Sequence, residues 1–251
     1  MAATEIAILG STTGKEQAEI DRRERIANEL VTADVDYLSV DHGPLSVESA
    51  VEEAWAGAAL LPLVNEHAGD YDAFVVSCFG EPGLTPLREL VEVPVVGTAA
   101  PTFHTAAQLA TQFSVLTILE ETVPMTREQV HALGLTRQVA SIRAVDAPVL
   151  SVDHESNALV EQMREVGRRA IEEDGAEALI PGCASLSFMQ VHQDLTEELG
   201  VPFLDPVRIA LGTAELWADH GITHSRAAYP EAPREKLDGL FGDGPKLSAD
   251  D

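Results

Sequence analysis

The chain of 251 residues has few aromatic residues, few lysines and only two cysteines. It also lacks any apolar run approaching the roughly 18 residues that a membrane-spanning helix needs, so a membrane protein is not expected. Its first residues carry neither the basic flank nor the apolar stretch of a secretory signal. We therefore expect a cytoplasmic protein whose core depends on Val, Leu, Ile and Ala.

The two cysteines, Cys78 and Cys183, lie 105 residues apart. Neither a CxxC motif nor a paired Cys/His spacing accompanies them, so the sequence gives no sign of a structural zinc site and we expect no metal. The spacing alone leaves a disulfide open, but a reducing cytosol disfavours one.

Negative charge greatly exceeds positive charge, with 42 acidic residues against 16 basic ones and a net charge of −26. Three of the basic residues are lysines and 13 are arginines. Such a surface repels phosphates and anionic lipids, so neither a nucleic acid nor a membrane is expected as a partner. At 1 M salt the Debye length is about 3 Å, so repulsion between the acidic residues is strongly screened. A halophilic source is our favoured explanation, and an acidic protein from an ordinary cytosol is the alternative.

Strand and helix patterns alternate along the chain, which is typical of parallel sheets covered by helices. Apolar runs predict strands at 5–10, 35–40, 73–77 and 93–97, then at 113–119, 140–143, 178–181 and 201–204. Helical spacing of apolar residues predicts helices at 15–33, 46–67, 124–133, 155–173, 186–199 and 206–220. The class is therefore α/β.

The second half of the chain repeats the strand and helix pattern of the first half. Ile6 aligns near Val115, Cys78 with Cys183, and Pro94 with Pro202, at offsets of 109, 105 and 108 residues. Such an internal duplication predicts two pseudo-symmetric lobes, each a parallel four-stranded sheet flanked by helices, with the active site in the cleft between them. We expect residues 1–98 plus 206–224 in the first lobe and 99–205 in the second. Residues 225–251 read as an acidic, loosely ordered tail.

Both cysteines fall at the carboxyl end of a predicted central strand, where parallel sheets place their ligand crevices. If the lobes face one another, the thiols flank one crevice from opposite sides. Inverting a carbon stereocentre through its C–H requires a base on one face and an acid on the other. A thiol with an ordinary pKa near 8.5 can be poised for either role by nearby donors. Free cysteines are more often small buried hydrophobic residues, but the matching placement favours catalysis.

Short segments after each cysteine offer such donors. The backbone N–H groups of Phe79 and Gly80, and those of Ala184 and Ser185, are candidates to hold substrate oxygens and to stabilise an enolate. We therefore count these four residues among the expected substrate-binding residues.

Several segments in order resemble the aspartate/glutamate/hydantoin racemase family, and within it the hydantoin racemases most. The resemblance is densest at Val75-Val-Ser-Cys-Phe-Gly-Glu-Pro-Gly-Leu84 and continues at Val93-Pro-Val-Val-Gly97, Phe103-His-Thr-Ala-Ala107, Phe113-Ser-Val-Leu-Thr-Ile-Leu-Glu120, Ala140–Leu150 and Pro181-Gly-Cys-Ala184. It implies a two-lobed enzyme without metal or organic cofactor, usually a homo-oligomer. In the family each cysteine is the base for one enantiomer while the other returns the proton.

The resemblance also implies that the polar turn after the first strand binds the substrate's polar group. Here that turn is Ser11-Thr12-Thr13, where the family commonly has Asn-Pro-Asn-Thr, and a helix N-cap is an equal alternative. Thr117 lies in the equivalent strand of the second half and either lines the crevice or belongs to the core. These departures touch substrate-contacting loops, so they bear on which substrate is bound.

The expected function is cofactor-independent racemisation by two cysteines, on a hydantoin or related ureido substrate. Allantoin or amino-acid racemisation, maleate cis–trans isomerisation, decarboxylation of a malonate and non-enzymatic binding of a small molecule are the alternatives, the last two being less favoured. His104, Glu81 and Glu120 are weaker candidates, because loop and helix carboxylates and solvated histidines are common without function. No segment of the sequence resembles a catalytic triad or a phosphate-binding glycine motif.

Overall fold

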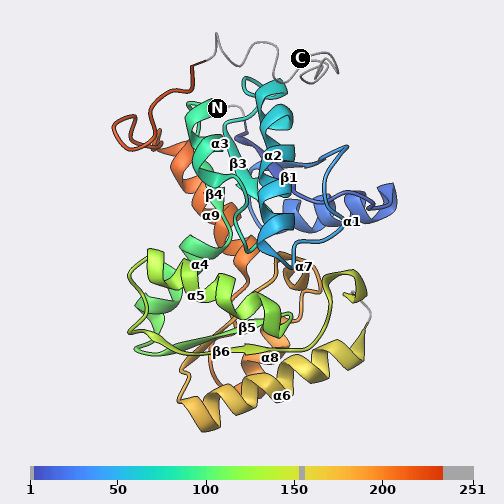
Figure 1. The fold of residues 1–251 in the computed structure, drawn as a ribbon, viewed down its shortest axis with the longest axis vertical. Coiled ribbons are helices and arrows are strands. Elements are labelled where there is room, and N and C mark those ends of the chain that lie inside the picture. Colours follow the sequence, from blue (N-terminus) through green and yellow to red (C-terminus); the bar gives the residue numbers. More distant parts are fainter. Residues whose placement is uncertain (1–2, 153–155, 234–251) are drawn as a thin grey trace, which may run out of the picture.

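The computed structural model describes residues 3–152 and 156–233. Two sheets, each made of parallel strands, lie one beyond the other and form its framework (Figure 1). The first sheet has the order β2-β1-β3-β4, with strands at Asp34–Ser39, Glu5–Gly10, Ala73–Val76 and Val95–Gly97. The second has the order β6-β5-β7, with strands at Val139–Ala144, Phe113–Thr117 and Ala178–Pro181. All strand pairs are parallel, which confirms the expected two-lobed α/β class.

The second sheet has three strands where four were expected. The segment predicted as its fourth strand, 201–204, forms only an isolated parallel bridge between Leu179 and Phe203. The N–H of Leu179 donates to the carbonyl of Pro202, and the N–H of Leu204 donates to the carbonyl of Leu179. Pro202 has no N–H of its own to extend this ladder, and a helix begins just after Leu204. The pairing therefore stays too short to make a strand.

The strands β1, β3, β4, β5 and β7 are buried on both faces, which explains their apolar runs, whereas the edge strands β2 and β6 remain partly exposed. In β1, Ile6 and Ile8 pack in one cluster with Ile26 and Val207, while the alternate residues face the opposite cluster. All four residues Ile6–Leu9 have no exposed surface. The central strand is thus fixed by helices on both sides.

Four helices cover the first sheet (Figure 1). On one face lie α1 (Gln17–Asn28) and α9 (Pro206–Asp219), and on the other lie α2 (Ala50–Glu66) and α3 (Leu84–Leu90). The α9 helix returns to this lobe after the second one is complete. Its N-cap, Asp205, accepts from the N–H groups of Val207 at 3.0 Å and Arg208 at 3.1 Å, which fixes where the helix begins.

Four further helices cover the second sheet. One face packs against α4 (Ala99–Leu109) and α5 (Val123–Ala132), and the other against α6 (Asn157–Asp174) and α8 (His192–Leu199). Single turns complete this lobe at η1 (Glu120–Thr122), η2 (Val149–Ser151) and α7 (Ala184–Ser187). The helix expected at 186–199 is therefore two helices, separated at Gln190, whose φ of 56° interrupts the helical path.

Each lobe has hydrophobic clusters of its own, with Ala184 and Phe188 joining a cluster of the first lobe and Phe79 joining one of the second. Residues of α9 share a cluster with β1, and residues of α4 share one with β5. We propose on this basis that 1–98 plus 206–224 form one lobe and 99–205 the other. No helix among the described residues is long and apolar enough to cross a membrane.

The expected loose tail begins in contact with the first lobe. Arg226 donates to the carbonyls of Arg88 and Val91, the Arg88 guanidinium donates to the Tyr229 hydroxyl, and the N–H of Ala232 donates to a carbonyl of α3. The remainder of the expected tail, 234–251, lies outside the described residues.

Candidate active site

A pocket lies between the lobes, where the carboxyl ends of both sheets meet. The empty space within it, counted together with open solvent at its mouth, is about 660 Å³. The first lobe and the segment after β7 contribute Ser11, Thr12, Lys15, Arg23, Tyr37, Val47, Ser77, Cys78, Phe79, Gly80, Gly182, Cys183, Ala184 and Ser185. The rest of the second lobe contributes Thr117, Ile118, Thr122, Met125, Thr126, Gln129 and Val149.

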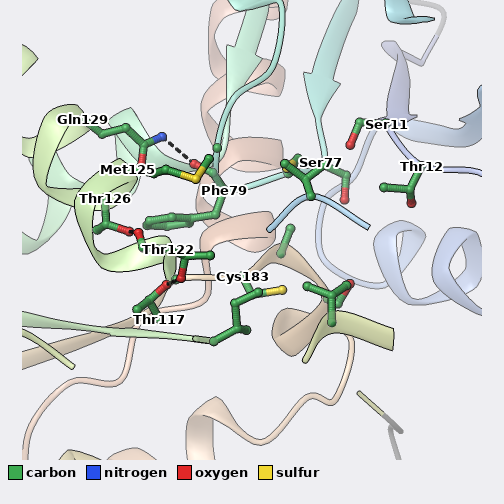
Figure 2. Close-up of a pocket in the computed structure, with 18 of the residues that line it drawn as sticks. Ser11, Thr12, Ser77, Phe79, Thr117, Thr122, Met125, Thr126, Gln129 and Cys183 are labelled. Atoms are coloured by element: carbon green, nitrogen blue, oxygen red, sulfur yellow. Dashed lines mark hydrogen bonds between the residues drawn. The ribbon is translucent and has the colours of Figure 1, made fainter. Parts of the chain in front are cut away.

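Strand ends position the polar side chains of the pocket. Ser11 follows β1, Cys78 follows β3, and Thr117 is the last residue of β5. Figure 2 shows Ser11 and Thr12 on one side of the pocket and Thr117 with residues of α5 on the other, while the Cys183 side chain extends into the space between them.

Gly182 lets the second cysteine reach this position. A Cβ at Gly182 would lie 3.0 Å from the Cα of Thr117, so the end of β7 approaches β5 more closely than a larger residue permits. The next residue, Cys183, is the N-cap of the single-turn helix α7 and is buried. The close approach directs the cysteine into the pocket beside Thr117.

Both cysteines are free thiols, so they form no bond with each other. Burial raises the pKa of Cys78 to about 12, and the negative charge of Cys183 also raises it. The backbone N–H of Gly80 and the hydroxyl of Ser11 oppose this shift by donating to the sulfur. The thiol is therefore a weak acid, next to donors that stabilise its thiolate.

The second thiol has an equivalent environment. Burial raises the pKa of Cys183, while the backbone N–H groups of Ser185 and Leu186 lower it. The positive charge of Arg23 and the Ser185 hydroxyl lower it further. Cys78 thus has two hydrogen-bond donors, from Gly80 and Ser11, and Cys183 has three, from Ser185 and Leu186. Such donors stabilise a thiolate.

Most of the predicted site residues meet in this pocket, with one exception. Ser11, Thr12, Cys78, Phe79, Gly80, Thr117, Cys183, Ala184 and Ser185 all line it. Thr13 lies outside, because its N–H and hydroxyl are turned toward the carbonyl of Pro44. It lines an adjoining outer groove instead. The Thr117 hydroxyl is engaged with that of Thr122 at 2.6 Å, so it is oriented by its neighbour.

The weaker candidates do not reach the pocket. His104 is exposed on α4, and neither it nor Glu120 lines the pocket. Glu81 accepts from the N–H groups of Ala99 at 2.8 Å and Ala100 at 2.9 Å. It thereby caps the start of α4, and its role in the described structure is to hold that helix.

Several lining residues were missed by the sequence analysis. They include Lys15, Arg23 and Tyr37 from the first lobe, and Gln129 from α5. Gln129 donates to the carbonyl of Phe79 at 2.7 Å and so ties the second lobe to the segment after Cys78. The spacing of apolar residues in a helix predicts which residues pack against the sheet of the same lobe. It does not predict which polar residues, such as Gln129, make contacts across the cleft to the other lobe.

Comparison with known proteins assigns the family. The sequence profile described as Asp/Glu/Hydantoin racemase matches residues 21–214. The chain belongs to this family. The hydantoin racemase of Paenarthrobacter aurescens is 33% identical over 204 residues, which are 80% of this chain and 86% of that protein. The family resemblance inferred from the sequence is thereby confirmed.

Solved structures of the racemase family have the same architecture. The allantoin racemase from Klebsiella pneumoniae is 31% identical, with a TM-score of 0.83 over 92% of this chain and 95% of that one. The allantoin racemase from Pseudomonas fluorescens is 28% identical, with a TM-score of 0.83 over 92% of this chain and 97% of that one. The chain is therefore an isomerase of the racemase type with the two-domain fold of its family.

Proposed function

We propose that the protein racemises a hydantoin or a related ureido compound such as allantoin, using Cys78 and Cys183 and no cofactor. The observation that carries the proposal is the pair of free thiols, one from each lobe, in a single pocket at matching strand ends. The similarity to hydantoin and allantoin racemases supports this substrate class.

The proton transfer needs one thiolate and one thiol. The thiolate removes the proton from the stereocentre, and the electron pair moves onto the adjacent carbonyl to give an enolate. The opposite thiol then donates its proton to the other face of the carbon. After the step the two cysteines have exchanged protonation states, so the enzyme is ready for the other enantiomer. Charge repulsion between the sulfurs supports the required state with a single thiolate.

The donors near each sulfur support the stabilisation of the enolate. Backbone N–H groups at Gly80 and Ser185 belong to the segments that follow the two cysteines. Such donors are most effective where charge develops in a site that excludes water. The hydroxyls of Ser11 and Thr12 supply further hydrogen bonds to ureido N–H or carbonyl groups. We propose the remaining predicted binding residues of the pocket for the same task, and Thr13 for an indirect one through its turn.

Chiral chromatography of enantiopure 5-substituted hydantoins and allantoin tests the proposed function. The wild-type enzyme is expected to convert each enantiomer of a substrate to the racemate, and in D₂O the product should carry one solvent deuterium. Enantiomeric purity that persists across the panel, at low and high salt, would exclude the substrate class. Aspartate, glutamate and maleate in the same assay distinguish the related activities.

Single-cysteine variants test the two-thiol mechanism. Cys78→Ala and Cys183→Ala are each expected to lose racemisation by at least about 10³-fold, because the opposite face has no proton donor or acceptor. Any residual deuterium exchange should favour opposite enantiomers in the two variants. Thr126→Ser, a conservative change in the same pocket, is the matched control. A single variant that still racemises at near wild-type rate would refute the mechanism.

A further inference from the structure

The charge of the pocket is opposite to that of the protein. The chain has a net charge of −26, yet the lining of the pocket includes Lys15 and Arg23 and no aspartate or glutamate among the described residues. Lys15 is one of only three lysines in the chain. Two buried or half-buried cations in an otherwise acidic protein require a local role, because a surface of this composition supplies few of them by chance.

Arg23 is held rigidly by its neighbours. Its Nε donates to Glu19 at 2.7 Å, its Nη1 faces the Tyr37 hydroxyl at 3.5 Å, and its guanidinium lies 4.6 Å from the centre of the Phe188 ring. Glu19 also binds Arg22, so one carboxylate is shared between two guanidinium groups. The positive charge of Arg23 is therefore only partly neutralised, and it extends to the pocket.

Lys15 has no carboxylate partner within ion-pair distance among the described residues. Its ammonium donates to the hydroxyl and the carbonyl of Thr12, both of which are uncharged. Burial and the nearby charge of Arg23 lower its pKa to about 8. The ammonium is thus a partly desolvated cation held by neutral acceptors, the state in which an incoming anion gains most from pairing with it.

The two cations lie where two cavities meet. Both line the inner pocket with the thiols, and both also line the outer groove, whose lining includes Glu16, Glu19 and Arg22 as well. Glu19 is already paired with Arg22 and Arg23. The cations are therefore in reach of a substituent that a substrate directs from the inner pocket toward the outer groove.

We propose that Lys15 and Arg23 bind a carboxylate on the substituent of the substrate, which makes the enzyme selective for ureido rings with an acidic side chain. This inference rests on the proposed racemase function and adds the charge of the preferred substrate to it. Arg23 offers a preorganised planar donor and Lys15 a compact point charge, a combination suited to one carboxylate.

Two probes of nearly identical shape test the inference: hydantoin-5-acetate, which is an anion at pH 7, and hydantoin-5-acetamide, which is neutral. The wild-type enzyme is expected to racemise the acetate with a kcat/KM at least about 10-fold higher, the scale of one charge-assisted hydrogen bond. In Lys15→Met the ratio of the acetate rate to the acetamide rate should fall to near one, because the acetate rate falls more than the acetamide rate. Lys15→Arg should retain most of the preference.

Arg25→Met is the matched control, because it removes an exposed positive charge from α1, the helix that carries Arg23 and begins just after Lys15. It should leave the ratio of the two rates unchanged. Equal rates for the two probes in the wild type would overturn the inference while leaving the racemase function intact. An equal loss of both rates in Lys15→Met would also overturn it, since Lys15 would then act on the reacting ring and not on the substituent.

The anion site can be tested by binding even if the protein has no racemase activity. If neither probe is racemised by any form of the enzyme, calorimetry decides the binding question with the same two compounds. Tighter binding of the acetate than of the acetamide, lost in Lys15→Met and kept in Arg25→Met, would support the anion site on its own. Equal affinities, or no binding of either compound, would refute it.

Discussion

The two thiols of the pocket are weak acids, and in the proposed mechanism this property limits the rate of the first proton transfer. Burial raises the pKa of both Cys78 and Cys183 above the ordinary thiol value. Backbone and hydroxyl donors offset part of the shift without reversing it. At neutral pH, therefore, only a small fraction of the enzyme holds the single thiolate that removes a proton.

This protonation predicts a rate that rises with pH. Because a raised pKa leaves the thiol protonated at neutral pH, the thiolate fraction increases about tenfold per pH unit until the pH reaches the pKa. We expect log kcat/KM for a neutral hydantoin to rise with a slope near +1 between pH 6 and 8, without a plateau below pH 9. Initial rates at constant ionic strength, with the enzyme-free rate subtracted, measure it. A plateau below pH 7 would contradict the raised pKa values.

Which site residues the sequence predicts depends on whether they follow strands. The sequence predicts Cys78 and Cys183 in one pocket because the carboxyl ends of parallel strands meet at one edge, whereas Ser11 was predicted from the family resemblance of its turn. Lys15 and Arg23 were missed, since their positions in and before α1 resemble an ordinary solvated face. Arg23 is buried by Tyr37 and Phe188, contacts that no local pattern encodes.

At the scale of the elements, one carboxylate connects the loop that follows Cys78 to the second lobe. Glu81 lies three residues after Cys78 with a φ of 55°, and its carboxylate caps α4, which packs on β5. A residue other than glycine keeps a left-handed backbone conformation only where the surrounding structure holds it there. The cap thus supports both the start of α4 and the conformation of the loop that carries Cys78.

Removal of this cap should destabilise the protein. Glu81→Ala leaves the N–H groups of Ala99 and Ala100 without an acceptor, at a cost of about 1–3 kcal/mol. For a protein of this size we expect the Tm to fall by about 2–10 °C. Glu81→Gln keeps an acceptor oxygen and should lose less. Differential scanning calorimetry compares the variants, and an unchanged Tm in Glu81→Ala would show that the cap contributes no net stability.

Element positions were predictable where one lobe determines them. The strands from 5–10 to 178–181 form close to their expected limits, because continuous apolar runs are the signature of strands buried on both faces. The helix expected at 186–199 divides at Gln190, which carries a positive φ without the Gly or Pro that would signal it. The sequence also does not predict that the pairing at Phe203 is limited to a single bridge, since the length of the pairing depends on the neighbouring strand β7.

At the scale of the whole molecule, the excess of acidic residues makes folding sensitive to salt. A net charge of −26 repels itself most in the compact state. The Debye length falls from about 10 Å at 0.1 M to about 3 Å at 1 M, so added salt weakens this repulsion. We propose a halophilic setting as the source of the composition, in agreement with the scarcity of lysine.

Thermal stability should therefore increase with salt at neutral pH. We expect the Tm to be higher by at least about 5 °C in 2 M KCl than in 0.1 M KCl at pH 7, because screening reduces the repulsion between like charges. Repeating both melts at pH 5, closer to the isoelectric point near 4.4, provides the control. The salt effect should shrink there as carboxylates are protonated. A Tm that falls with KCl at pH 7 would contradict self-repulsion as the dominant effect.

In the proposed mechanism, the sharing of the pocket between two lobes means that neither half of the chain alone could change handedness. A lobe with one sulfur would still exchange a proton with the solvent, but it would return the proton to the face from which it came. Mirror-image conversion would then depend on how the two lobes are held together, so loss of the hydrogen bond from Gln129 to Phe79 is expected to favour proton exchange with retention over racemisation.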